Sequence, residues 1–241
     1  MGFLDLLFPK ICIGCKKSGS YFCSQCEKQA KLHFPQVCPV CERNSIDGLT
    51  HVRCKKGFVP NGLISLWDYQ GVPKKAIGKL KYKFVRSIAS ELVIPLVKQL
   101  KEAQRVNLDT PEWNRGKFTI VPIPLYWMRE NWRGFNQSEE LARLLAEKMS
   151  SEGGSASGGG WEVVKLLERK AKGRSQVGLK EKERKENIEG VFKVSNSVMC
   201  LPSNPIILFD DVWTTGSTML EATRVLKKAG VKKVWCLTLA R

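Results

Sequence analysis

Histidine, acidic residues and long apolar runs are all scarce in this sequence of 241 residues. His33 and His51 are the two histidines and both lie near the N-terminus, so the rest of the chain offers no imidazole as a general base. No apolar stretch approaches the roughly 18 residues that a membrane-spanning helix needs. The first residues, MGFLDLLFPK, lack the basic segment and cleavage site of a signal peptide. These absences favour a protein of the cytosol.

The shortage of acids leaves a strongly basic chain. It has 40 Lys and Arg against 23 Asp and Glu, a formal net charge of +17. A field of this sign attracts nucleic acid, phosphorylated metabolites and anionic lipid alike. Charge therefore predicts a polyanionic partner without naming it, and a generally basic surface with no partner is the alternative.

Seven of the nine cysteines fall within residues 12 to 54 and form pairs at metal-ligand spacing. The four ligand pairs are Cys12 with Cys15, Cys23 with Cys26, Cys38 with Cys41, and His51 with Cys54. Such pairs are typical of zinc sites in a reducing compartment. Grouping in chain order predicts an all-thiolate site followed by a mixed site, and an interleaved grouping is the alternative. Iron–sulfur ligation and disulfides are the other readings.

We expect one or two structural zinc ions in this segment. Protein ligands fill every position, so zinc catalysis is not expected. The segment is too short to build its own apolar core, and the metal would supply its stability.

The chain divides by composition into a cysteine-rich module, residues 1–58, and a second region, residues 59–241. Strand-like runs lie at 117–124, 161–168, 204–211 and 232–240, and helical periodicity at 86–104, 136–149 and 217–229. Alternating strands and helices predict an α/β fold with a mostly parallel, twisted sheet and helices on both faces. Residues 150–160 are Gly/Ser-rich and predict a flexible loop, and the charged segment 169–187 predicts either a solvated helix or a mobile cover.

The run IILFDDVWTTGST at 206–218 combines a buried strand, two acids and a polar loop that opens a helix. Ligands of open α/β sheets bind at this edge. The loop residues Thr214, Thr215, Gly216, Ser217 and Thr218 offer hydroxyls and helix N-terminal amides to a phosphate. Asp210 and Asp211 suit ribose hydroxyls or a hydrated Mg²⁺. The alternative is an ordinary strand-turn-helix with an acidic cap.

This run resembles the signature of type I phosphoribosyltransferases, in which the acids hold the ribose and the loop holds the 5′-phosphate of 5-phosphoribosyl pyrophosphate (PRPP). Four further motifs resemble the ComF family, whose members also begin with a zinc ribbon; here His51 replaces a usual cysteine. The motifs are VPIPL at 121–125, RGFNQSEELA at 133–142, SQVGL at 175–179 and ERKENIEGVF at 183–192. The resemblance covers nearly the whole chain and implies a phosphoribosyltransferase-like domain after a double zinc ribbon.

If PRPP binds with Mg²⁺, its pyrophosphate must meet cations or amides on a neighbouring strand end. Arg133, Asn136 and Gln137, at or just before a predicted helix start, are the candidates, with Arg129 as second choice. The alternative for Arg133 is an exposed surface charge.

Basic residues alternate with aromatics in KKAIGKLKYKFVR at 74–86, a mixture that suits single-stranded nucleic acid. The candidate DNA-binding residues are Lys79, Lys81, Lys83, Arg86 and Arg174. The alternative is a solvated helix with its aromatics in the core. The ComF resemblance implies natural competence, in which incoming single-stranded DNA is handled in the cytosol.

Our first hypothesis is therefore a protein that binds PRPP, or a related phosphoribosyl nucleotide, and single-stranded DNA. The alternative is an active phosphoribosyltransferase with an unidentified acceptor. A third hypothesis is an assembly factor whose zinc module docks a partner such as a competence helicase.

Overall fold

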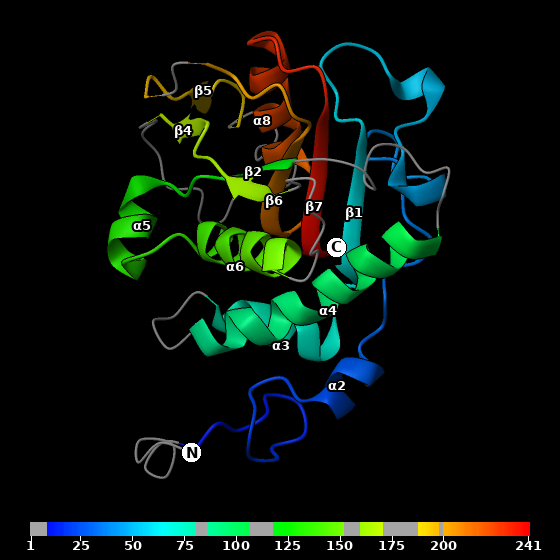
Figure 1. Cartoon of the computed structure of the whole chain (residues 1–241), viewed down its shortest axis with the longest axis vertical. Coiled ribbons are helices and arrows are strands. Elements are labelled where there is room, and N and C mark those ends of the chain that lie inside the picture. Colours follow the sequence, from blue (N-terminus) through cyan, green and yellow to red (C-terminus); the bar gives the residue numbers. More distant parts are fainter. Residues whose placement is uncertain (1–8, 81–85, 107–117, 152–159, 171–187, 198–199) are drawn as a thin grey trace.

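The central feature of the fold is a sheet of five parallel strands in the order β1-β7-β6-β2-β3 (Figure 1). The computed structural model describes residues 9–80, 86–106, 118–151, 160–170, 188–197 and 200–241. The sheet strands are β1 (Gly62–Trp67), β2 (Phe118–Pro122), β3 (Trp161–Val163), β6 (Ile206–Val212) and β7 (Val234–Ala240). The predicted α/β class is confirmed.

Both faces of the sheet are covered, because its strands are apolar on both sides. Strand β6 shows this directly: Ile207 and Phe209 pack into one hydrophobic core, and Ile206 and Leu208 pack into the other. The first core is closed by α3 (Gly71–Lys79), α4 (Arg86–Val106) and α6 (Gln137–Ser151). The second is closed by α8 (Ser217–Lys228) and by an antiparallel ribbon of β4 (Leu167–Arg169) and β5 (Phe192–Val194).

The predicted helices at 86–104, 136–149 and 217–229 correspond to α4, α6 and α8. The predicted strand at 161–168 is wrong in its extent, since the chain leaves the sheet after β3 and enters the separate ribbon at β4. Four short elements complete the described residues: α2 (Ser24–Gln29), the 3-10 turns η1 (Ile46–Gly48) and η2 (Val52–Cys54), and α5 (Trp127–Arg133). None of the described helices combines the length and apolarity needed to cross a bilayer.

The cysteine-rich module covers the open edge of β1. Single antiparallel bridges join Leu32 to Trp67 and Leu49 to Gly62, at the two ends of the strand. Such an edge would otherwise expose unpaired N–H and C=O groups to other chains. The module therefore protects the sheet at the strand where it ends.

Between these bridges, the side-chain amide of Gln36 takes the place of a neighbouring strand. Its Nε2 donates to the Ser65 carbonyl at 2.9 Å, and the Ser65 N–H donates to its Oε1 at 2.9 Å. Gly48 makes the close approach of this segment to β1 feasible. It has a φ of +71°, and a Cβ there would lie 1.8 Å from the Leu63 carbonyl oxygen.

The module also shares its interior with the sheet. Cys12, Phe22 and Cys26 belong to the first core, where the Phe22 ring meets Trp67 edge-on with centroids 5.4 Å apart. The composition boundary at residue 58 thus separates two kinds of sequence, whereas the buried interior is continuous across it.

We predict that Gln36→Ala lowers the free energy of unfolding by about 2 to 4 kcal/mol, because it leaves the buried N–H and the buried C=O of Ser65 without hydrogen-bond partners. Urea denaturation of the zinc-loaded protein measures this. Gln25→Ala removes an exposed glutamine that bonds to Lys17, and should change the same quantity by less than about 0.5 kcal/mol. Equal losses in the two variants would show that Gln36 does not support the strand.

Candidate functional site

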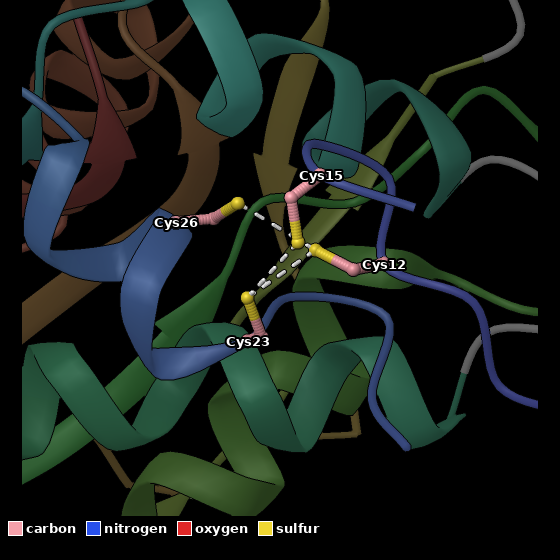
Figure 2. A group of neighbouring side chains, drawn as sticks. All are labelled: Cys12, Cys15, Cys23 and Cys26. Atoms are coloured by element: carbon pink, nitrogen blue, oxygen red, sulfur yellow. Dashed lines mark hydrogen bonds between the residues drawn. The ribbon is translucent and has the colours of Figure 1, made fainter. Parts of the chain in front are cut away.

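The first four cysteines converge on one point (Figure 2). The Cys12 Sγ lies 3.6 Å from the Cys23 Sγ and 3.7 Å from the Cys26 Sγ, and the Cys15 Sγ lies 3.6 Å from the Cys23 Sγ. A tetrahedral zinc ion with Zn–S bonds of about 2.3 Å requires sulfur separations of about 3.8 Å. A disulfide would require about 2.05 Å. The donor set fits zinc, and all nine cysteines are free thiols.

The electrostatics of this cluster also favour a cation. Burial pushes the pKa of Cys12 upward, but the backbone amides of Cys23, Cys15 and Gly14 outweigh it and lower the pKa to about 6. Burial and the neighbouring thiols instead raise the pKa of Cys26 to about 12. Four thiolates at this distance repel one another, so a divalent metal is needed to ionise them all.

The second cluster contains Cys38, Cys41, His51 and Cys54, whose ligand atoms lie within 4.8 Å of one another. The His51 Nδ1 lies 3.3 Å from the Cys41 Sγ, and its Nε2 contacts the Asn44 carbonyl at 3.1 Å. Donation from Nε2 leaves Nδ1 unprotonated toward the thiols, the arrangement of a metal-binding imidazole. The grouping in chain order is confirmed, and the interleaved alternative is wrong.

A second constellation lies at the carboxyl end of β6. The Ser138 hydroxyl donates to the Asp210 Oδ1 at 2.7 Å, and the Gln137 amide donates to the Asp211 Oδ2 at 3.2 Å. The Arg133 guanidinium donates to the Gln137 Oε1 at 2.6 Å. The residues predicted separately for ribose and for pyrophosphate thus form one hydrogen-bonded chain.

Asn136, a predicted pyrophosphate-binding residue, makes its side-chain contacts within the fold instead. Its Oδ1 accepts from the Ser138 N–H at 3.0 Å, which caps α6, and its Nδ2 donates to the Ile123 carbonyl at 3.1 Å. Because the side chain is buried and both ends of its amide are used within the fold, Asn136 positions the start of α6. Ser138 was not among the predicted site residues, although its place in the first turn after this cap is a recognisable signal.

The Asp210 carboxyl is strongly affected by its surroundings. Burial raises the pKa of Asp210 to about 8, with repulsion from Asp211 as the second cause, and the bond from Ser138 opposes only part of this rise. Burial and Asp211 also raise the pKa of Tyr69, which follows β1 at the same sheet edge. The Lys74 Nζ lies 5.4 Å from the Tyr69 ring centroid. Tyr69 is thus an additional group beside the acidic pair, and Lys74 lies over its ring.

The loop after β6 is shaped by Gly216, which caps α8 with a φ of 70°. A Cβ at Gly216 would lie 2.1 Å from the Trp213 ring, so the buried indole forms the floor of the loop and requires glycine above it. The Thr215 and Ser217 hydroxyls lie 2.7 Å apart at the helix start. Thr214 is exposed and Thr218 is half-buried. The arrangement presents hydroxyls and first-turn amides together, as a phosphate site requires.

His33 is another residue whose place the sequence did not indicate. The module brings it to the carboxyl end of β1, where its Nδ1 lies 2.8 Å from the Asp68 Oδ1. An ion pair with Lys31, together with His33, lowers the pKa of Asp68 in spite of burial. A histidine that is remote in sequence therefore lies at the same edge of the sheet as the acidic pair.

The predicted DNA-binding residues are only partly described. Lys79 is exposed at the end of α3, and Arg86 begins α4. Lys81, Lys83 and Arg174 lie outside the described residues, as does the SQVGL motif at 175–179.

Comparison with known proteins finds relatives over nearly the whole chain. The chain is 26% identical over 243 residues to Competence protein F of Haemophilus influenzae, covering 100% of this chain and 94% of that protein. It is 29% identical over 242 residues to the DNA utilization protein YhgH of Salmonella typhimurium, covering 96% and 98%. Competence protein ComFC of Streptococcus pneumoniae is 25% identical over 234 residues, covering 94% and 90%. No family model matches the chain.

We predict two zinc ions per chain in the purified protein, because each cluster supplies four ligands. Cys15→Ser combined with Cys23→Ser should leave one ion and lower the melting temperature, since the first cluster is part of the sheet's core. Elemental analysis by mass spectrometry measures the metal. Cys200→Ser, which removes an exposed thiol outside both clusters, should keep both ions. Zinc-free protein of unchanged stability would contradict this assignment.

Proposed function

Because the chain is a ComF-family protein by its likeness to these relatives over nearly its full length, we propose that it binds PRPP at the carboxyl edge of the sheet and single-stranded DNA on its basic surface. The contacts of Ser138 with Asp210 and of Gln137 with Asp211 carry the PRPP assignment. They bring the two predicted parts of the site, distant in sequence, to one place.

The geometry supports a separate role for each part of this site. Asp211 and Asp210 accept hydrogen bonds from the ribose hydroxyls, and the Thr215–Ser217 loop holds the 5′-phosphate at the start of α8. Arg133 lies one hydrogen bond from this pair, through Gln137, and offers a guanidinium to the pyrophosphate. Mg²⁺ bound with PRPP would neutralise part of the charge that the two carboxylates place beside the phosphates.

The DNA assignment rests on charge and on the relatives. The names of two relatives refer to competence and that of a third to DNA utilization, over an alignment that includes nearly all of this chain. The net charge of +17 is of the sign that a polyanion requires. Single-stranded DNA is the polyanion that both observations fit.

Asp211→Ala combined with Thr215→Ala should weaken PRPP binding by at least about 100-fold, because it removes a ribose acceptor and a phosphate donor, each worth about 1.5 to 3 kcal/mol. Titration calorimetry with Mg²⁺ and PRPP measures the affinity. Glu102→Ala, an exposed acid on α4, is the control and should bind as the parent protein does. Unchanged affinity in the double variant, at an unchanged melting temperature, would reject the site.

PRPP affinity should also depend on pH through Asp210. With a pKa of about 8, this carboxyl is mostly protonated at pH 7, whereas acceptance of two hydroxyl bonds needs the carboxylate. Affinity should therefore rise about tenfold between pH 7 and pH 9, where the phosphates are already ionised. The ligand-free protein should lose stability as pH rises toward 8, because there the folded carboxyl binds a proton that the unfolded one has released.

Calorimetry across this pH range tests the effect, with Asp210→Asn as the comparison. The variant keeps an acceptor oxygen but has no carboxyl to titrate, so its affinity should stay level. A parent protein whose affinity is equally level would mean that Asp210 does not contact the ligand.

A further inference from the structure

A cavity of about 420 Å³ is lined by residues of α5, of β4 and of the segments beside them. These elements lie at the end of the sheet opposite β1 (Figure 1). The cavity volume is within the range of small-molecule sites, about 300 to 1,000 Å³, and suits a single nucleotide. The residues that line this cavity include Pro124, Trp127, Asn136, Lys165, Arg169 and Ser195.

The exposed aromatic side of this cavity comes from α5. Trp127 lines it and is 52% exposed, whereas Trp132 on the same short helix is 71% exposed and lies outside the lining. A large aromatic side chain left exposed at a cavity is a candidate contact for a ligand. The Tyr126 ring lies 5.9 Å from the Trp127 ring and tilts 52° against it, which limits the orientations of the indole. An indole held in place at a cavity mouth is a stacking surface for a planar ring.

The charges around the cavity permit an anion, although three glutamates line it. The Glu139 carboxylate is paired with Lys165 at 2.7 Å and Arg143 at 2.8 Å. The Glu168 carboxylate is paired with Lys193 at 2.8 Å and accepts the Ser195 hydroxyl. These pairs cancel most of the negative charge and keep lysine ammonium groups at the exposed rim.

The remaining polar groups suit the edge of a nucleobase. Glu130 supplies a carboxylate that accepts from exocyclic amines. The Ser195 and Ser197 hydroxyls beside it already bond to each other at 2.7 Å. A purely apolar peptide would desolvate the Glu130 carboxylate without offering it a donor, which costs binding energy. A stacked base with its phosphates beside the exposed Lys165 ammonium satisfies both the aromatic and the polar parts of the lining.

We propose that this cavity holds one nucleotide of single-stranded DNA, with its base stacked on Trp127 and its phosphates beside Lys165 and Arg169. This assignment rests on the DNA binding in the proposed function, and it assigns that binding to a defined surface. Asn136 lines the cavity and also caps α6, whose next residues contact the acidic pair. The DNA and PRPP sites thus lie on two sides of one helix start.

Fluorescence anisotropy with a labelled oligothymidine of about 15 nucleotides tests the proposal on the full, zinc-loaded chain. Trp127→Ala should weaken binding about 5- to 30-fold, the loss expected for one stacked base. The matched control is Trp132→Ala, which removes a more exposed indole from the same helix and should change affinity by less than about twofold. An oligonucleotide with iodouracil bases should crosslink to the tryptic peptide that contains Trp127.

The outcomes separate this proposal from the function on which it rests. Parent protein with no affinity for the oligonucleotide would remove the DNA half of the proposed function, whatever the variants show. Parent protein that binds, with Trp127→Ala and Trp132→Ala both unaffected, would overturn the cavity assignment and place the DNA elsewhere. Loss in Trp127→Ala of nucleobase-dependent pyrophosphate release from PRPP, with DNA affinity intact, would instead make the cavity an acceptor site.

Discussion

A parallel sheet must be covered on both faces, and it brings the carboxyl ends of its strands to a common edge. This constraint explains the position of every group in the candidate PRPP site. Asp210 and Asp211 end β6, Tyr69 follows β1, and Arg133 lies in the connection after β2. The helices that cover the faces begin at the same edge, so α6 and α8 bring their N-terminal turns to the carboxylates and to the candidate phosphate loop.

The cysteine module packs against this sheet because the edge strand β1 also has to be covered. The strand β1 is an edge, and the module satisfies its backbone with two bridges and the Gln36 amide. Cys12 and Cys26 also lie in the core beneath α3 and α4. Metal at the first cluster is thereby coupled to the packing of the sheet, and the second cluster lies beside the chain that protects β1. Zinc bound in such a module would stabilise the sheet as well as the loops of the module.

Burial creates the chemistry of the acidic pair. Two carboxylates beside each other at a sheet edge repel, and desolvation raises the pKa of Asp210 to about 8. Hydrogen bonds from the Ser138 hydroxyl and the Asp211 N–H compensate only in part. A ligand that brings hydroxyl donors and a cation would relieve this unfavourable state. That relief would contribute to the free energy of binding. The start of α6 lies between this site and the cavity beside Trp127.

Local sequence patterns specify the features that depend on neighbouring residues. Cys-x2-Cys spacing encodes a pair of ligands, an apolar run encodes a buried strand, and Asp210 to Ser217 encode a strand end followed by a helix start, because each is set by backbone geometry over a few residues. Long-range packing sets the grouping of the two clusters, the pairing of Gln137 with Asp211 across 74 positions, and the cavity between α5 and the β4–β5 ribbon. It also divided the apolar run at 161–168 between two sheets. Such contacts join residues that are remote along the chain, so their positions depend on how the whole core packs.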